Sequence, residues 1–311
     1  TPTLARMIAA KKKTILLPIR WYSIPNLFRY ESPQKGRLRE HWQLNVDIFG
    51  IKGIEAEIEI ISIANLLLKN FGLKQNQYEI RINSRKIINY ILLDLFKLDH
   101  NKAHIVSKIL DKKNKISGDE FKKKISEILT EKTERFLQII NSKNFEELVS
   151  KLGSNAEKEE GFKEVKMLME KLDEMDMSNV VFCQSLMRGF DYYTGIVFEI
   201  FDTNPDNPRS IFGGGRYDDL LSIFDSEKIP AVGMGAGDVI IKDVLETYDL
   251  LPKYKNNTKL YVCVTDNQFS SDAIKFAEKI RENNVNISVN LTEKKVGDQI
   301  KYADKNKIPF V

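Results

Sequence analysis

At its most informative point the chain reads Met187-Arg188-Gly189-Phe190-Asp191-Tyr192-Tyr193-Thr194-Gly195 and then continues as Ile196-Val197-Phe198-Glu199-Ile200-Phe201. The first run places a guanidinium, a carboxylate and two phenols between glycines. The second has the branched and aromatic content of a β-strand. Arginine can clamp an anionic oxygen, and tyrosine rings supply apolar walls with one polar tip each. The sequence therefore predicts a cluster that binds a small polar molecule beside an anion, held on a rigid sheet. Taken alone, the run is also compatible with a polar turn that leads into a strand.

A β-hairpin is predicted upstream, with strands over residues 27–31 and 41–48 and a turn between them. The second strand alternates strictly, so successive side chains point to opposite faces. One face is lined with hydrogen-bonding groups and the other is directed to the core. The core residues expected here are Trp42, Leu44, Val46 and Ile48, and the polar row is His41, Gln43, Asn45 and Asp47.

The hairpin also carries a pattern that suits a nucleoside triphosphate. Arg29 and Glu31 share a face of the first strand, and a basic loop with Arg37 follows. A strand arginine can hold the phosphate nearest the reacting centre, and a loop arginine can hold the tail. Gln43 and Asp47 could bind an ammonium or amide group of a small ligand. The simpler interpretations are a basic surface hairpin and ordinary exposed polar positions.

Two glycine-rich runs follow, Phe212–Asp218 and Ala231–Gly237. Glycine lets backbone approach a ligand closely, and the second run precedes an apolar helix, where an anion can bind. Neither run has the spacing of a P-loop or of a dinucleotide-binding fingerprint. A plain turn and helix-packing glycines remain as alternatives.

The composition and periodicity of the remaining segments predict the domain organisation. Residues 55–70 form an amphipathic helix, and residues 99–178 are an all-helical insertion with rare glycine and no proline. The predicted catalytic domain therefore has two parts, 1–98 and 179–251. A linker over 252–258 leads to a β-α-β-α-β segment over 259–311, which predicts a small α/β domain.

Composition excludes several classes of protein. Of the 311 residues 42% are hydrophobic and 30% charged, the net charge is +4, and the longest apolar runs are too short to span a bilayer. Cys183 and Cys263 are the only cysteines, so neither a disulfide framework nor a cysteine-based metal site is expected. The chain begins Thr1-Pro2-Thr3 and stops inside a predicted strand, so both ends are expected to be truncated.

Together these segments closely resemble the histidyl-tRNA synthetases, a family of class II aminoacyl-tRNA synthetases. Phe28–Glu31, with Pro33–Arg37 and Gln43, is similar to class II motif 2. Leu186–Gly195 and Gly213–Asp218 are similar to two histidine-specific signatures. Pro230–Gly233 matches the start of motif 3, and Thr1–Met7 the helix after the family's first substrate-binding turn.

The resemblance implies an α+β fold. A six-stranded antiparallel sheet of the class II synthetase type is flanked by helices and carries a helical insertion and a partial C-terminal anticodon-binding domain. It implies a reaction in which L-histidine and ATP, with Mg²⁺, form histidyl-adenylate, and histidine is then transferred to histidine tRNA. A cytoplasmic homodimer with no membrane association is expected, and an organellar targeting segment before Thr1 stays open.

The resemblance also implies residue roles. Arg29 and Arg188 are the expected catalytic residues at the α-phosphate, and Arg37 reaches the triphosphate tail. Glu31 and His41 face the adenine, with His41 in place of the family's usual aromatic. The implied histidine-binding residues are Thr1, Gln43, Asp47, Arg188, Tyr192, Tyr193, Gly213 and Gly215. No side chain is assigned to a metal, and no side-chain base is required because the substrate carboxylate is already the nucleophile.

Three departures from the family pattern stand out. The part that carries motif 1 is absent, and the anticodon-binding domain stops partway. Motif 3 usually ends in Glu-Arg, but this chain reads Asp238-Val239-Ile240, so the motif 3 cation is missing. The alternatives are a histidine-sensing regulatory subunit of ATP phosphoribosyltransferase, which the tail after residue 258 disfavours, and a catalytically inactive synthetase-like domain.

Overall fold

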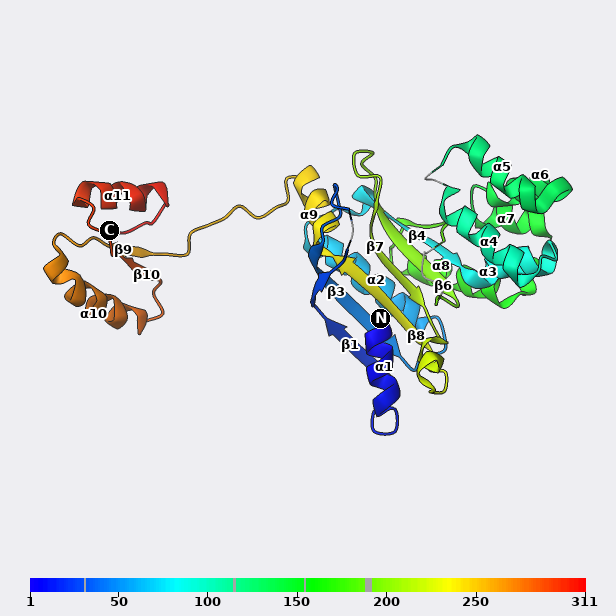
Figure 1. Ribbon diagram of the computed structural model, residues 1–311, viewed down its shortest axis with the longest axis horizontal. Coiled ribbons are helices and arrows are strands. Elements are labelled where there is room, and N and C mark those ends of the chain that lie inside the picture. Colours follow the sequence, from blue (N-terminus) through cyan, green and yellow to red (C-terminus); the bar gives the residue numbers. More distant parts are fainter. Residues whose placement is uncertain (31, 114–115, 154, 188–191) are drawn as a thin grey trace. The chain divides into compact units, whose positions relative to one another are not determined.

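The computed structural model describes residues 1–30, 32–113, 116–153, 155–187 and 192–311, which form two compact units, Thr1–Leu251 and Pro252–Val311. Figure 1 traces the helices and strands of each unit. Two predicted site residues, Glu31 and Arg188, lie outside the described residues. The finer division of the first unit, at residues 98 and 178, stays a prediction.

The first unit is built on an eight-stranded sheet in the order β1-β3-β8-β7-β6-β4-β5, with β2 paired to β3. All of its pairs are antiparallel except β4 with β5. The strands are β1 (Ile19–Ser23), β2 (Asn26–Phe28), β3 (Glu40–Phe49), β4 (Tyr78–Ser84), β5 (Val180–Phe182), β6 (Ile196–Asp202), β7 (Ser210–Arg216) and β8 (Ala231–Gly237). Within the described ranges six strands have five or more residues, and β2 and β5 have three each. The predicted antiparallel α+β architecture is confirmed, but the sheet has eight strands where six were expected, because the short strands β2 and β5 add to it.

Neighbouring residues of one strand enter different cores, which defines the two faces of the sheet. Ile48 and Phe198 belong to the larger core, whereas their neighbours Phe49 and Val197 belong to the smaller one. Helices α2 (Glu55–Asn70) and α9 (Asp238–Thr247) contribute to the larger core (Figure 1). Helix α1 (Pro2–Lys11) and the 3₁₀ helix η6 (Leu220–Phe224) contribute to the smaller one.

The predicted inward row of β3 is correct for three residues and wrong for the fourth. Ile48 is buried, and Leu44 and Val46 pack against the larger core. Trp42 is 53% exposed. It lies beyond the last pair between β3 and β8, Gln43 with Gly237, on the part of β3 that extends past the main sheet. Alternation predicts on which face of the strand a side chain lies. It does not predict how far along the strand other elements pack against that face.

Side-chain caps and glycines mark the ends of several helices. Helix α2 occupies the predicted 55–70 range, and Gly72 follows it with a φ of +94°, a conformation that suits glycine. Residues 85–95 form α3 (Arg85–Asn89) followed by a π-helical segment η2 (Tyr90–Leu95). Asp99, Ser117 and Asn144 each accept a backbone N–H in the first turn of the helix that follows.

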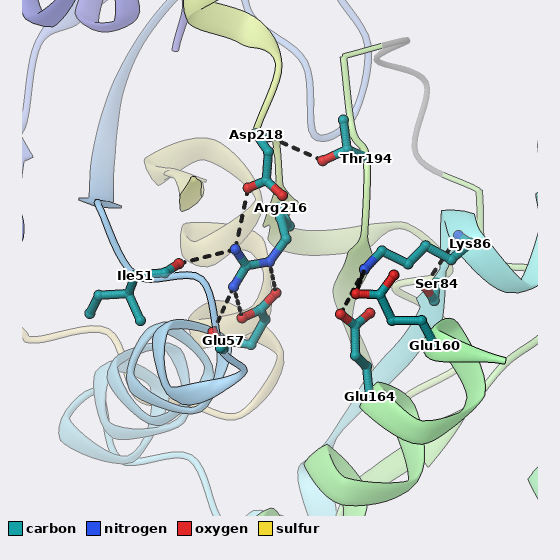
Figure 2. Close-up of polar contacts among 10 residues, drawn as sticks. Ile51, Glu57, Ser84, Lys86, Glu160, Glu164, Thr194, Arg216 and Asp218 are labelled. Carbon is teal, nitrogen blue, oxygen red and sulfur yellow. Dashed lines mark hydrogen bonds and ion pairs between the residues drawn. The ribbon is translucent and has the colours of Figure 1, made fainter. Parts of the chain in front are cut away.

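The segment predicted as an insertion is helical throughout its described elements. It contains α4 (His100–Asp111), α5 (Gly118–Leu129), α6 (Thr133–Ile140), α7 (Phe145–Leu152) and α8 (Glu160–Glu174). Its buried side chains, such as Phe136 and Leu148, belong to the larger core, which one face of the sheet also forms. Lys86 of α3 also pairs with Glu164 and Glu160 of α8 at 2.7 and 3.1 Å (Figure 2). The helical segment therefore extends the core of the first unit.

The second unit has the predicted β-α-β-α order. It consists of β9 (Leu260–Val262), α10 (Ser270–Arg281), β10 (Ile287–Val289) and α11 (Val296–Lys305), and the two strands are parallel. A parallel bridge between Leu260 and Phe310 marks where the predicted third strand begins.

One buried arginine connects the end of β7 to helix α2 and to the loop that precedes that helix. At the end of β7, the Arg216 guanidinium donates to both Glu57 oxygens at 2.6 Å (Figure 2). It also donates to the carbonyls of Gly53 (2.8 Å) and Ile51 (3.1 Å) and to Asp218 at 3.2 Å. Burial opposes its charge, but the hydrogen bonds and negative charges of Glu57 and Asp218 together outweigh burial and hold the pKa of Arg216 above its ordinary value. Arg216 therefore fixes the first turn of α2 to the sheet.

Replacing Arg216 tests this connection. We expect Arg216→Met to lower the free energy of unfolding by about 3–5 kcal/mol, because it leaves the Glu57 carboxylate buried without its partner. Urea unfolding followed by tryptophan fluorescence measures this, since Trp21 and Trp42 both lie in the first unit. Arg20→Met is the matched control, because it breaks the more exposed pair of Arg20 with Glu59. Similar small losses in both variants would contradict a structural role for Arg216.

Candidate active site

A cavity of about 660 Å³ lies on the face of the sheet that α1 covers, over β3, β7 and β8. The loop between β2 and β3, the start of α9 and the segment before β6 complete its walls. The charged and hydrogen-bonding residues of the lining are Thr1, Arg29, Arg37, His41, Gln43, Asn45, Tyr192, Tyr193, Glu199 and Ser210.

The cavity exists because the strands beneath it carry glycine at alternate positions. Gly213 of β7 pairs with Gly235 of β8, and Gly215 pairs with Gly233. These glycines share the face of the β3 polar row, since Gly235 pairs with Asn45. A sheet face without side chains leaves a hollow, and side chains from neighbouring strands can lie across it.

Three side chains use this space. A Cβ atom at position 233 would be 2.1 Å from Asp47 Oδ1, and one at position 235 would be 2.7 Å from Gln43 Nε2. A Cβ atom at position 215 would be 2.9 Å from the Tyr193 ring. Glycine is therefore needed at these positions so that the predicted ligand-binding side chains can lie flat over the next strand.

Asp47 lies at the bottom of this arrangement, just behind the cavity lining. It is 3% exposed and accepts a short hydrogen bond from the Tyr217 hydroxyl. Burial raises the pKa of Asp47 above its ordinary value, and the bond from Tyr217 partly offsets that rise. The Tyr217 ring packs edge-on against Phe49 and Tyr192 at centroid distances of 6.0 and 5.8 Å. Tyr217 thus connects Asp47 to the tyrosine pair.

The structure brings together a residue predicted to bind phosphate, Arg29, and a residue predicted to bind the amino group, Gln43. Arg29 Nη2 donates to Gln43 Oε1 at 3.3 Å, and Gln43 Nε2 donates to Asn45 Oδ1 at 2.6 Å. The backbone N–H of Arg29 bonds to the Arg39 carbonyl at 2.8 Å, which holds the base of the loop. Gln34 and Arg37 close the tip of that loop with two backbone bonds of 3.1 and 2.8 Å.

The tyrosine pair forms the opposite wall. The Tyr192 and Tyr193 rings lie 4.7 Å apart, and Tyr193 is 7% exposed. Glu199 is the one carboxylate among the described lining residues. Such a wall offers apolar ring surface with a few polar groups, which suits a flat heteroaromatic ligand.

Most of the predicted site residues meet in this cavity. Thr1, Arg29, Arg37, His41, Gln43, Tyr192, Tyr193 and Gly213 line it. Gly215 and Asp47 lie directly behind the lining, under Tyr193 and over Gly233 respectively. The predicted roles of Glu31 and Arg188 concern positions outside the described residues.

Sequence reasoning missed three residues of the site. Asn45 was seen in the polar row of β3 without a role in binding. Glu199 is the single charged residue in the otherwise apolar run 196–201, a signal that could have identified it. Tyr217 lies two residues after Gly215, but its contact with Asp47 spans 170 residues of sequence and leaves no local signal.

Within the described ranges no group of three or more histidine, cysteine, aspartate or glutamate side chains could hold a metal ion. In the same part of the chain no helix combines the length and apolar character that crossing a bilayer requires.

Two glycine variants test the close approach of side chains to β8. We expect Gly233→Ala to lower the free energy of unfolding by about 1–3 kcal/mol, because Asp47 is buried and held by Tyr217 and cannot move aside freely. Gly235→Ala should cost less, because it meets the flexible end of Gln43. Gly118→Ala is the control, since a Cβ there meets nothing within 4 Å. Urea unfolding measures all three, and equal values for positions 233 and 118 would contradict the packing.

The pH dependence of stability tests the Asp47–Tyr217 bond. Because burial raises the folded-state pKa of Asp47, its ionisation reduces stability as pH rises from the unfolded pKa of about 3.9 toward the folded value. Tyr217→Phe removes the donor and raises that folded pKa further. We therefore expect its loss of stability, about 1–3 kcal/mol, to be larger at neutral pH than below the unfolded pKa.

Tyr78→Phe is the matched control for that measurement. The buried Tyr78 hydroxyl donates to the uncharged amide of Asn65 at 2.5 Å. Its loss should therefore not change with pH in the acid range. Parallel pH profiles for the two variants, obtained from urea unfolding, would contradict an ionisable partner for Tyr217.

The chain is similar to known proteins along nearly all of its length. A family model described as Histidyl-tRNA synthetase matches residues 1–237, and one described as Anticodon binding domain matches residues 259–311.

A histidine–tRNA ligase of Leptospira biflexa is 42% identical over 313 residues, which cover 98% of this chain and 70% of that protein. One from Picrophilus torridus is 36% identical over 317 residues, which cover 100% and 73%. A crystal structure of histidyl-tRNA synthetase from Nostoc sp. PCC 7120 superimposes with a TM-score of 0.79 at 21% identity, over 98% of this chain and 72% of that one. The chain belongs to the histidyl-tRNA synthetase family.

Proposed function

We propose that this chain ligates L-histidine to its cognate tRNA through a histidyl-adenylate intermediate made from ATP. One observation carries the proposal. Arg29, a phosphate ligand by its position in the motif 2 hairpin, touches Gln43, an amino-group ligand, inside a single cavity walled by two tyrosines. An adenylate joins a phosphate to an amino acid, so its binding site must hold both groups side by side.

In this proposal catalysis consists of positioning and charge stabilisation. The carboxylate of histidine attacks the α-phosphate, so no side chain has to remove a proton. Arg29 and Arg188 take the charge that develops at that phosphate, and Arg37 on the loop takes the tail. Arginine suits these positions because its planar fork of donors matches phosphate oxygens.

Histidine is recognised on the glycine side of the cavity. Gln43 and Asp47, with Thr1 nearby, are the proposed partners of its amino group. Tyr192 and Tyr193 enclose the imidazole above the bare backbone of Gly213 and Gly215. A site built to pair with the ring nitrogens rejects apolar analogues, because its own polar groups would then be left unpaired.

ATP and Mg²⁺ are the proposed co-substrate and cation. His41 and Glu31 are the proposed neighbours of the adenine. Mg²⁺ prefers oxygen ligands and is usually bound through substrate phosphates with one or two carboxylates. Glu199 is the one carboxylate that lines the described cavity, so the phosphates would supply most ligands. The bound ion would add counter-charge to that of the arginines.

The second unit supports tRNA as a substrate, since its sequence matches an anticodon-binding family. We also propose a homodimer. Strand β1 ends the order of the sheet, and exposed apolar side chains cluster on it and near it. These residues are Leu16, Trp21, Tyr22, Ile24 and Phe28. The cytoplasm is the proposed location, because a reducing compartment suits the two free cysteines.

Two features favour a ligase over a histidine-sensing regulatory subunit. A sensor has no use for an anticodon-binding unit, and it has no need of a phosphate clamp beside the amino-acid ligands. The alternative of a catalytically inactive domain rests on the missing motif 3 arginine. An assay of histidyl-adenylate formation decides between that alternative and a ligase.

Pyrophosphate exchange tests the proposal. We expect folded full-length protein to exchange pyrophosphate into ATP with histidine and with no other amino acid. Arg29→Ala should reduce kcat/KM for ATP at least tenfold, because it removes charge stabilisation worth several kcal/mol. Arg20→Ala, on a neighbouring strand and paired with Glu59, is the matched control. Failure of the folded wild-type protein to exchange would favour a sensor or an inactive domain.

A further inference from the structure

Strands β7 and β8 and helix α9 contribute no cation to the described lining of the cavity. The arginines that line the cavity are Arg29 and Arg37, and both come from the hairpin side. On the other side β7, β8 and α9 contribute glycines and apolar residues, including Ile240. Ile240 stands where the resemblance places the motif 3 arginine. A triphosphate is usually clamped by several cations, so a further cation beside position 240 would suit the proposed nucleotide.

Arg209, in the turn just before β7, is a candidate for that charge. Its Nη2 donates to Gln34 Oε1 at 2.8 Å. Its Nη1 is buried and has no hydrogen-bond partner among the described residues. A buried guanidinium N–H without an acceptor is unfavourable, and such a group calls for an explanation.

Arg209 and Ile240 reach the same point of the motif 2 loop. A Cβ atom on Gly36 would be 3.5 Å from Arg209 Nη1 and 3.3 Å from Ile240 Cγ1. Gly36 and Ile240 both line the cavity, as does Ser210, the next residue after Arg209. Gly36 has a φ of +75°, which favours glycine, and a side chain here would fill the space beside Nη1.

We propose that Arg209 supplies to ATP the cation that position 240 lacks, with Nη1 donating to an oxygen of the triphosphate. The inference rests on the proposed function and adds a nucleotide-binding residue to it. The unpaired donor favours an anionic oxygen over stacking on the adenine, because stacking would leave the N–H unsatisfied. Arg209 comes from the β6–β7 turn beside the lining residue Ser210, so it would supply the charge from a different element than α9.

A second role for Arg209 has to be separated from this one. The β6–β7 turn also holds the loop, since Lys35 Nζ donates to the Asp206 carbonyl at 3.3 Å and Arg209 donates to Gln34. If Arg209 were only a support for the loop, removing its loop partner would have the same effect as removing its charge. Gln34→Ala makes that separation, because it deletes the contact and keeps the guanidinium.

The experiment compares Arg209→Met, Gln34→Ala and the double variant Arg209→Met with Ile240→Arg against wild type. KM for ATP and KM for histidine are measured by pyrophosphate exchange, and the Kd for ATP by calorimetry without histidine. We expect Arg209→Met to raise KM and Kd for ATP roughly ten- to a hundredfold, since it removes a charged hydrogen bond. KM for histidine should stay unchanged, Gln34→Ala should have a smaller effect, and the Ile240→Arg change should restore ATP binding.

An unchanged Kd for ATP in Arg209→Met would overturn the inference, and so would an equal loss in Gln34→Ala. Calorimetry does not depend on turnover, so the inference is tested even if wild type fails to exchange. Absence of exchange in wild type would refute the proposed function alone. Circular dichroism of each variant shows that a loss of ATP binding does not come from unfolding.

Discussion

The site depends on one steric constraint, which is that β7 and β8 present backbone without side chains on the face where β3 presents its polar row. Asp47 and Gln43 lie across Gly233 and Gly235, and the Tyr193 ring lies over Gly215. Small movements of a packed core cannot make a hollow in a sheet. The glycines therefore determine both the volume of the cavity and the orientation of the side chains that lie across it.

The rest of the first unit holds this bare region in place. Arg216 directly follows the glycine run and points away from the cavity, where it joins the start of α2 to β7. Tyr217, the next residue, points back and supports Asp47. One short signature therefore has three structural uses: its glycines make the hollow, its arginine anchors the sheet, and its tyrosine holds the carboxylate below the site.

The sequence predicted what depends on local pattern. Helix α2 has the predicted range, because apolar periodicity and a glycine after its end coincide, and the polar row of β3 faces the cavity because alternation fixes the face. The glycine runs were correctly expected to permit close approach, but not the identity of the approaching side chains. Those contacts, like the pairing of Arg216 with Glu57 over 159 residues, come from strand order, which periodicity does not specify. For Trp42 the strand face follows the predicted alternation, but no other described element packs over that position to bury the side chain.

The central claim is that one cavity holds an amino acid and a nucleotide phosphate side by side. A crystal structure of the full-length protein with a non-hydrolysable histidyl-adenylate analogue tests it most directly. The account predicts the phosphate mimic between Arg29 and Arg188, the amino group at Gln43 and the imidazole between the tyrosine pair and the bare strands. An analogue bound elsewhere, or side chains of residues 29 and 188 that face separate cavities, would contradict it.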